Sequence, residues 1–280
     1  VSETLGLLYA DHFPYRQKET ARGLRRSPFH DRLADRGAVF GELAGWERAN
    51  WFARDGQERA YRYSWGRQNW FDTVGEEHKA CREAAVVFDQ TSFAKFTLKG
   101  PDAEAALSWI AANDVAKPVG SIIYTQMLND RGGIECDLTA VRVAKDEYYI
   151  VTGTGYATHD FDWISRNIPE GMNAQLVDVT SSNAVLSLMG PKAREILQSI
   201  TRDDISNEAF PFGTARIIGI AGCPVRAMRV TYVGELGWEL HLPVEYATTV
   251  YDALMQAGQP HGLRDAGYRA IESLRLEKGY

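Results

Sequence analysis

Hydrophobic and polar positions follow the same order in two separate parts of the chain. Residues 96–110 (FTLKGPDAEAALSWI) and 186–200 (LSLMGPKAREILQSI) both start with alternating positions, pass through Gly-Pro and continue with apolar residues at helical spacing. A proline is tolerated in the first turn of a helix, where its missing backbone N–H has no partner to lose. The pattern therefore predicts a strand, a turn at Pro101 or Pro191, and a helix in each stretch.

Similar segments follow each of the two stretches. An Asp-Val and a Gly-Ser pair follow the first helix, and an Asp-Ile and a Gly-Thr pair follow the second. Four strand-like segments come next, two in each half: residues 122–128 (IIYTQML), 136–143 (CDLTAVRV), 215–221 (ARIIGIA) and 225–233 (VRAMRVTYV). Two copies of a strand-helix-strand-strand unit predict an α+β fold with pseudo-symmetric antiparallel sheets, covered by helices on one face. The alternative is a chance similarity between two Gly-Pro helix starts.

Three further stretches carry apolar residues at intervals of three and four, which is typical of helices. They are residues 76–87, 246–258 and 268–279. The last of them ends at Gly279, a residue typical of helix C-termini. Because the chain starts without methionine and this helix is expected to lead onward, we interpret the sequence as a piece of a larger protein.

The first 75 residues differ from the rest. They are basic around residues 22–32 and then dense in tryptophan, at Trp46, Trp51, Trp65 and Trp70. One interpretation is an irregular segment that wraps around the core and packs these rings on it. The other is a docking surface for a neighbouring domain.

Composition limits the function classes. With 45% hydrophobic residues in 280, the chain can bury a sizeable core, while a net charge of −6 argues against a protein that grips the nucleic-acid backbone. Three widely spaced cysteines offer neither a disulfide framework nor a CxxC motif, which favours a reducing compartment. No segment resembles a membrane span or a signal peptide. We expect a soluble protein without nucleic-acid or membrane partners, in the cytoplasm or, in a eukaryote, the mitochondrial matrix.

Several chemical signatures are absent from the sequence. It contains no GxGxxG after a strand, no GxxxxGK[ST] and no GxSxG, so nucleotide binding and serine hydrolysis are not indicated. Its six histidines show no HExxH or similar spacing. We therefore predict that the chain binds no metal.

The first candidate site lies in the stretch YTQMLNDRGGIECDL. Tyr124 is on one predicted strand, a Gly-Gly turn reverses the chain, and Asp137 begins the return strand. A carboxylate at this point needs water, a hydrogen-bond donor or a ligand, because burying it alone is costly. It is either an exposed turn residue that bonds nearby backbone N–H groups or a functional acid.

The second candidate site lies in RVTYVGELGWELHLP, where a Gly-Glu-x-Gly turn is predicted to join two strands. Tyr232 precedes the turn and Glu239 follows it. Period-two alternation places Glu239 and His241 on one face and Trp238 on the other. Glu239 either lies on a solvated strand face or takes part in binding. An acid and a tyrosine beside each glycine-rich hairpin suit a cleft for a flat heterocycle rich in donors.

These motifs carry a family resemblance. AGWE, FDQTSFAKFTLKGPDA, YTQMLNDRGGIECDLTAVRV, SLMGPKAREIL, YVGELGWELHLP and SLRLEKGY resemble, in order and approximate spacing, the folate-dependent aminomethyltransferase family. Its founding member is the aminomethyltransferase of the glycine cleavage system. The N-terminal stretch before them resembles more narrowly the region that follows the flavin domain in dimethylglycine and sarcosine dehydrogenases.

The resemblance implies a division of the chain and a set of partners. Residues 1–26 would connect to a flavin domain of the same polypeptide, absent from this chain and holding FAD. Residues 27–280 would form the folate-binding aminomethyltransferase-type domain, lacking the C-terminal barrel of the family. The implied cofactor is tetrahydrofolate. The implied substrate is a small methylated amine or its iminium, whose one-carbon unit would give 5,10-methylenetetrahydrofolate.

The resemblance also assigns roles to individual residues. Asp137 matches the carboxylate beside folate N5 and N10, as the catalytic residue. Glu239 matches the acid that accepts the N–H groups of the pterin ring, and Tyr124 and Tyr232 match aromatic contacts of the pocket. The family has a folate-binding arginine where this chain has Ile271. Arg269, two positions away, is the remaining candidate for a cofactor contact, although it lies on another face of the helix.

Three functions stay open from the sequence. The first is a one-carbon transfer module of a flavin-dependent dimethylglycine or sarcosine dehydrogenase. The second is a freestanding aminomethyltransferase or folate-dependent demethylase. The third is a non-catalytic folate-binding or structural module, because a fold does not guarantee an activity.

Overall fold

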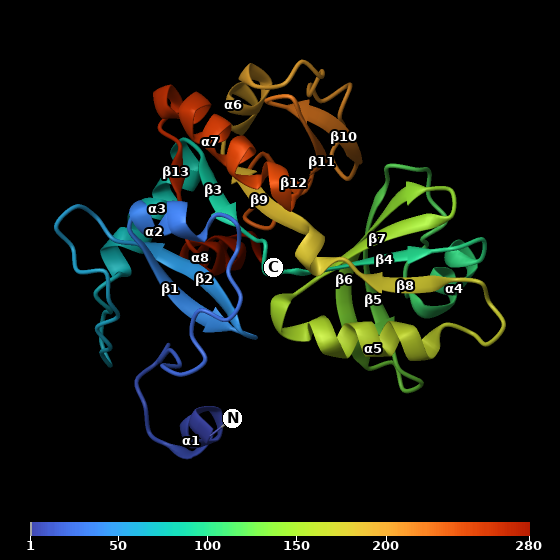
Figure 1. Cartoon of the computed structure of the whole chain (residues 1–280), viewed down its shortest axis with the longest axis horizontal. Coiled ribbons are helices and arrows are strands. Elements are labelled where there is room, and N and C mark those ends of the chain that lie inside the picture. Colours follow the sequence, from blue (N-terminus) through green and yellow to red (C-terminus); the bar gives the residue numbers. More distant parts are fainter. Residues whose placement is uncertain (1) are drawn as a thin grey trace.

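A computed structural model describes residues 2–280 and divides them among three sheets (Figure 1). The N-terminal part forms a two-stranded sheet flanked by helices. Its elements are α1 (Ser2–Tyr9), α2 (His30–Asp35), β1 (Ala38–Leu43), β2 (Trp46–Phe52) and α3 (Phe71–Glu83). None of the helices in the described residues is long and apolar enough to cross a membrane.

The middle of the chain forms a five-stranded antiparallel sheet of order β5-β6-β7-β4-β8. Its strands are β4 (Ala94–Lys99), β5 (Ile122–Leu128), β6 (Ile134–Ala144), β7 (Glu147–Thr152) and β8 (Gln175–Asp178). The helices α4 (Ala103–Ile110) and α5 (Ala157–Asn167), the latter preceded by η1 (Thr154–Tyr156), contribute to the apolar core on one face of this sheet. This unit occupies the right-hand side of Figure 1.

The C-terminal part forms a six-stranded sheet of order β10-β11-β12-β9-β3-β13, in which only β13 and β3 run parallel. Its strands are β3 (Val86–Asp89), β9 (Asn183–Met189), β10 (Ala215–Ile220), β11 (Cys223–Met228), β12 (Gly237–Pro243) and β13 (Arg264–Asp265). Its helices are α6 (Ala193–Ser199), α7 (Ala247–Gly258) and α8 (Tyr268–Lys278), with the short helices η2 (Thr180–Ser182), η3 (Val244–Tyr246) and η4 (Gln259–His261).

The predicted internal repeat is confirmed by the strand orders. The run β5-β6-β7-β4 in one sheet matches β10-β11-β12-β9 in the other, and α4 and α6 follow equivalent strands. Backbone bonds match as well, because the Gly120 N–H donates to the Arg142 carbonyl at 2.7 Å and the Gly213 N–H to the Arg229 carbonyl at 3.0 Å. The α+β fold with paired antiparallel sheets is therefore present, and residues 2–280 contain no closed barrel.

The two copies are joined where their equivalent strands begin. The Ile122 N–H donates to the Gly213 carbonyl at 2.9 Å, and the Ala215 N–H donates to the Gly120 carbonyl at 2.7 Å. Beside this junction, residues from both sheets form one buried apolar cluster: Val141, Tyr149, Ala215 and Met228. The inner faces of the sheets therefore pack against each other at this end.

Two of the predicted boundaries are wrong. The helix predicted at residues 76–87 starts earlier, as α3, and ends at Glu83, because Val86 and Val87 pair with β9 instead and are buried. The strand predicted at residues 225–233 ends at Met228. Arg229 leaves the β11–β12 ladder and donates its backbone N–H to the Thr214 carbonyl. The remaining strands and helices lie within three residues of the prediction. Pro101 and Pro191 lie in turns just before their helices.

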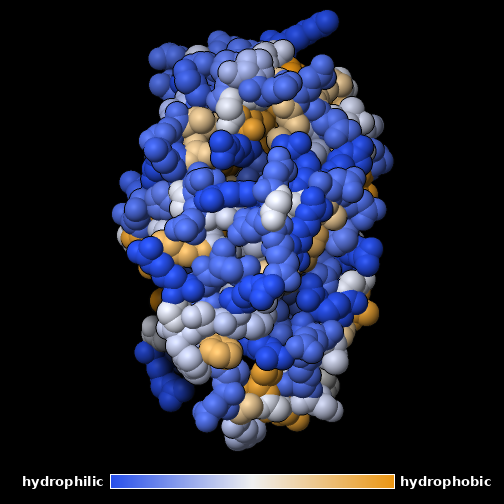
Figure 2. Space-filling view, turned by 90° about the vertical axis from the view of Figure 1, so that its left-hand side faces the viewer, coloured by the Kyte–Doolittle hydropathy of each residue, from blue (hydrophilic) through white to orange (hydrophobic). Residues whose placement is uncertain are grey.

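The tryptophan-rich segment wraps around the core. Trp46, Trp51 and Trp70 are buried, whereas Trp65 is 72% exposed and contacts the ring of Phe13, with ring centroids 5.0 Å apart. Figure 2 shows that the face on this side of the molecule is mainly hydrophilic, with apolar residues in small separate groups. Three of the four rings pack on the core, as the wrapping interpretation expects. The segment is not irregular, because Trp46 and Trp51 lie on β2.

Glu77 joins three elements of this region. Its carboxylate accepts the Phe52 N–H of β2 at 2.7 Å and the Gly267 N–H before α8 at 2.8 Å. The side chain is buried, and burial raises the pKa of Glu77 to about 8 despite the two hydrogen bonds, which lower it. The protonated form is therefore favoured in the folded state near neutral pH.

This shift predicts a pH-dependent stability. The folded-state pKa of Glu77 exceeds its unfolded value of 4.5, so its contribution is complete below pH 4.5 and is lost as pH rises to about 8. In Glu77→Gln this dependence disappears. Between pH 5 and pH 8 the free energy of unfolding of the wild type should fall by about 2 to 4 kcal/mol relative to Glu77→Gln, measured by urea denaturation.

The matched control is Glu76→Gln, which changes an exposed glutamate on the same helix, paired with Arg54 at 2.8 Å. It should follow the pH profile of the wild type. A difference between wild type and Glu77→Gln that stays constant from pH 5 to pH 8 would contradict a raised Glu77 pKa.

Gly190 begins the turn between β9 and α6 at φ +131°, and an added Cβ would lie 2.5 Å from the Ala84 carbonyl oxygen. Gly190→Ala combines backbone strain with this clash, so it should lower the free energy of unfolding by about 3 kcal/mol or more in urea denaturation. Gly155→Ala is the control, because no atom lies within 4 Å of its added Cβ. Equal stability of the two variants would show that the turn can relax.

Candidate functional site

The β5–β6 hairpin positions the predicted catalytic acid. Asn129 closes the turn, since its side-chain oxygen accepts the N–H groups of Arg131 at 3.0 Å and Gly133 at 2.9 Å. Asp137 then lies opposite Gln126 in the register, and the Gln126 amide donates to its carboxylate at 3.2 Å. Asp137 is exposed, so the carboxylate is available to a ligand.

Tyr124 shares a strand face with Gln126 and is 60% exposed. A hydrogen bond to the Asp137 carboxylate is the main reason that the pKa of Tyr124 is raised, with smaller contributions from burial and from the negative charge of Asp137. The phenol therefore stays protonated next to the carboxylate. The structure brings these two predicted residues together.

Tyr232 reaches the same place from the other sheet. It lies in the loop between β11 and β12, not on a strand, and its ring stacks on that of Tyr280 with centroids 5.8 Å apart. Burial raises the pKa of Tyr232. Arg275 lowers it, and the negative charges of Glu272 and then Asp137 raise it. Tyr232 therefore lies within electrostatic range of Asp137, although Arg275 and Glu272 of α8 affect it more.

The Gly-Glu-x-Gly turn that carries Tyr232 is held by Arg82 of α3. The Arg82 guanidinium donates to the Val233 carbonyl at 2.7 Å and to the Glu235 carboxylate at 2.9 Å, and it also pairs with Glu277 of α8 at 3.1 Å. Glu235 is therefore occupied by an ion pair. The loop is fixed to two helices, which restricts where Tyr232 can lie.

Glu239 lies on β12 beside a buried histidine. As predicted, Glu239 and His241 share one face, whereas Trp238 points into the core of the six-stranded sheet. His241 Nε2 lies 3.4 Å from the Glu239 carboxylate, and His241 Nδ1 lies 3.0 Å from the Tyr149 hydroxyl. Burial lowers the pKa of His241, so the ring is neutral and relays one hydrogen bond to Glu239 while accepting another from Tyr149.

This relay leaves Glu239 with spare acceptor capacity. Its side chain keeps 18% of its surface exposed, and within residues 2–280 its carboxylate accepts no other hydrogen bond. A carboxylate has about four lone-pair positions, so it can still accept two donors from a ligand. The free oxygen is therefore available to N–H donors of a ligand.

Asp137 and Glu239 lie on the facing surfaces of the two sheets. Asp137 shares its strand face with Val141, four residues along β6, which corresponds to about 13 Å. Val141 packs with Met228, and Met228 lies directly opposite Glu239 in the β11–β12 register. The exposed acid is therefore at the open end, and Glu239 lies nearer the buried cluster.

Arg269 is not part of this arrangement. Its guanidinium carbon lies 4.3 Å above the Tyr15 ring and 5.8 Å from that of Trp70, both in the N-terminal segment. It lines a separate cavity of about 710 Å³, which none of the other four predicted residues lines. Ile271 is buried against Phe88 of the six-stranded sheet. The cofactor role of Arg269 stays a prediction.

Sequence reasoning missed two groups of residues. Alternation along β12 linked His241 to Glu239, but no signal linked either to Tyr149, 92 residues away in sequence from His241.

Cys136, His159 and Asp160 also gather in the described residues, with candidate ligand atoms within 4.8 Å of one another. The Asp160 carboxylate already accepts hydrogen bonds from Thr152 at 2.5 Å and His159 at 3.0 Å. The expectation that the chain binds no metal stays a prediction. The three cysteines are free, as expected.

Comparison with known proteins identifies the fold. Residues 29–280 match the family model described as the GCVT N-terminal domain. The chain belongs to this family. The GCVT domain of this chain also resembles the crystal structure of glycine cleavage system aminomethyltransferase T from Bartonella henselae, with a TM-score of 0.75 and 26% identity over 92% of this chain and 63% of that one. The predicted family and fold are confirmed, whereas the boundary at residue 27 stays a prediction.

Curated relatives match almost the whole chain. Human mitochondrial sarcosine dehydrogenase is 41% identical over 97% of this chain and 34% of its own length. The 4-methylaminobutanoate oxidase (formaldehyde-forming) of Paenarthrobacter nicotinovorans is 46% identical over 99% of this chain and 34% of its own length. Human mitochondrial dimethylglycine dehydrogenase is 36% identical over 96% and 31%. The chain spans about a third of the length of these relatives.

The contact between Tyr124 and Asp137 can be tested directly. In Asp137→Asn the negative charge is lost, so the pKa of Tyr124 should fall toward its usual value of about 10. A pH titration of tyrosine ring carbons by NMR measures it, with Tyr124→Phe assigning the signal. Glu135→Gln is the control, because that carboxylate bonds Asn129 at 2.7 Å instead. An unchanged Tyr124 pKa in Asp137→Asn would show that the two groups do not interact in solution.

Proposed function

We propose that this GCVT domain binds tetrahydrofolate between its two sheets and captures the one-carbon unit of an oxidised N-methylated amino acid as 5,10-methylenetetrahydrofolate. The observation that carries the proposal is the position of two acids on facing sheets, one exposed and one oriented by a buried histidine. Membership of the family supports the cofactor. The names of the relatives support the class of substrate.

Glu239 would hold the pterin end. Its carboxylate accepts from neutral His241, which is itself fixed by the Tyr149 hydroxyl, so the carboxylate is oriented before a ligand arrives. Two N–H donors of the ring would then find two acceptors already in place, which reduces the entropy cost of binding. Tyr124 and Tyr232 offer exposed ring surface for the rest of the ligand.

Asp137 would act at the reacting nitrogen atoms. When bound, tetrahydrofolate supplies the nitrogen nucleophile that takes up the one-carbon unit. The carboxylate lies in a partly aromatic setting, where its negative charge stabilises a positive iminium more strongly than it would in bulk water. It would also accept the proton that the attacking nitrogen loses and pass it to the demethylated amine, which leaves when the second folate nitrogen bonds to the same carbon. The Tyr124 hydroxyl would hold the carboxylate in position during this step.

Oxidation would take place elsewhere in the polypeptide. The relatives named as dehydrogenases and oxidases are about three times as long as this chain. We propose that the intact protein includes a flavin domain with FAD, which forms the iminium that this domain receives. The relatives named as mitochondrial support a mitochondrial matrix location in the case of a eukaryotic source.

A second function is favoured by one comparison. The relative that is 46% identical is named as formaldehyde-forming, so a domain with this fold occurs in a protein named for releasing the one-carbon unit. In that case the chain would shape or support the oxidase without capturing the unit. The two functions predict different products from the same substrate.

The deciding experiment is Asp137→Asn in the intact protein, with sarcosine or 4-methylaminobutanoate as substrate. Amine oxidation, followed with an artificial electron acceptor, should be unchanged. Formation of 5,10-methylenetetrahydrofolate should fall about 100-fold and formaldehyde should rise in proportion, because the carboxylate beside the nucleophile is neutralised. Both products are quantified by chromatography.

Asp130→Asn is the matched control, since Asp130 is an exposed carboxylate in the turn of the same hairpin. It should leave both products unchanged. Undiminished methylenetetrahydrofolate in Asp137→Asn would reject the role of Asp137. Formaldehyde as the sole product of the wild type, with or without tetrahydrofolate, would support the second function instead.

A further inference from the structure

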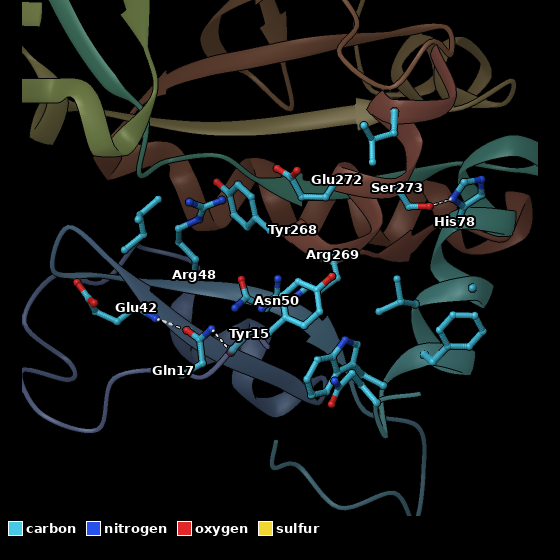
Figure 3. Close-up of a pocket in the computed structure, with 18 residues that line it drawn as sticks. Tyr15, Gln17, Glu42, Arg48, Asn50, His78, Tyr268, Arg269, Glu272 and Ser273 are labelled. Atoms are coloured by element: carbon cyan, nitrogen blue, oxygen red, sulfur yellow. Dashed lines mark hydrogen bonds between the residues drawn. The ribbon is translucent and has the colours of Figure 1, made fainter. Parts of the chain in front are cut away.

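A separate cavity lies between the N-terminal segment and α8. It has a volume of about 710 Å³ and is bounded by β1, β2, α3 and α8, with aromatic walls from Tyr15, Trp70 and Tyr268 (Figure 3). This volume is in the range of small-molecule sites. The cavity takes no part in the folate site described above.

Two arginines face this cavity without a carboxylate partner. Arg48 of β2 has its guanidinium carbon 3.3 Å from the centre of the Tyr268 ring, and Arg269 of α8 lies 4.3 Å above Tyr15. Neither forms an ion pair within residues 2–280, and the Nε atom of each is buried without a hydrogen-bond partner. Burial is the main cause that lowers the pKa of Arg269. Tyr61, Tyr15 and Glu272 raise it, and the positive charge of Arg48 makes a smaller contribution that lowers it.

The acids at the edge of the cavity form their direct ion pairs with other side chains, although the negative charge of Glu272 raises the pKa of Arg269. Glu42 pairs with Lys18 at 3.0 Å, and Glu272 pairs with Arg275 at 2.9 Å. His78 is also engaged, because it bonds Ser273 at 3.1 Å. The cavity therefore keeps two neighbouring positive charges that repel each other, a situation that a bound anion would relieve.

The walls are fixed in advance of any ligand. The Gln17 side chain donates to the Tyr15 carbonyl at 3.0 Å and accepts the Glu42 N–H at 3.1 Å, as the dashed lines in Figure 3 show. Asn50 is held by a bond to Tyr61 at 2.8 Å. Because the guanidinium of each arginine lies over an aromatic ring, little side-chain entropy remains to be lost on binding.

We propose that this cavity is a second small-molecule site, which binds a carboxylate between Arg48 and Arg269. A guanidinium offers paired N–H donors whose spacing matches a carboxylate, and aromatic walls suit a small aliphatic body beside it. The volume exceeds that of one carboxylate group, which favours a whole molecule over a single inserted side chain. We assign this carboxylate to an N-methylated amino acid. That assignment rests on the proposed function, whereas the binding of a carboxylate does not.

Arginine footprinting tests the site in the intact protein. Phenylglyoxal modifies free guanidinium groups, and mass spectrometry of chymotryptic peptides reads each arginine separately. Sarcosine or acetate should slow modification of Arg48 and Arg269 at least fivefold, whereas N-methylethanolamine, which has no carboxylate, should not. Arg25 is the internal control, because it is stacked on Trp46 at 4.2 Å but is exposed and lies outside the cavity.

In Arg48→Gln, sarcosine should no longer protect Arg269. Equal modification of both arginines with and without carboxylates would overturn the proposal. So would arginines that resist modification in the absence of any carboxylate, since another segment of the intact protein would then cover them. The readout needs neither folate nor turnover, so it is independent of the outcome for Asp137→Asn.

Discussion

The reciprocal backbone bonds between residues 120 and 215 and between residues 122 and 213 are the constraint on which the rest of the structure depends. They join the two copies of the repeat at equivalent strand starts, so that the inner faces of both sheets must look toward each other. The buried cluster beside them then fills the space between the sheets. Because side chains alternate along a strand, this single junction decides which residues face the space between the sheets.

The space between the two sheets is buried near the junction and open at its far end, and this difference in exposure affects its chemistry. Near the junction, a neutral His241 orients Glu239, which suits recognition because little water competes there. Farther out, Asp137 is exposed beside two tyrosines, one from each half. A ligand that spans both ends would place its recognition groups inside and its reactive groups where a second substrate can reach them. The repeat thus provides two unlike acids from two similar halves.

The sequence predicted the parts of this arrangement that are governed by local pattern. The alternation around Glu239, the hairpin that carries Asp137 and the repeated Gly-Pro starts all follow from residue spacing. It could not predict the bond between Tyr149 and His241, because strand alternation does not say which faces meet. It also misplaced the end of β11, since Arg229 bonds the backbone of residues 213 and 214 just before β10 and no longer pairs with β12, a tertiary effect without a local signal.

The difference between local pattern and tertiary contact also explains Arg269 and Ile271, near the start of α8. Residues two apart on a helix point about 200° apart, so Ile271 faces the six-stranded sheet while Arg269 faces the tyrosines of the N-terminal segment. Ile271 adds apolar surface where the resemblance implies a cation for folate. Arg269 instead joins Arg48 across a different cavity. Arg275, on the same helix, interacts electrostatically with Tyr232 instead, so the positive charges of α8 are not confined to one side. The arginine of the proposed carboxylate site therefore points away from Ile271, the position where the resemblance implies a folate contact.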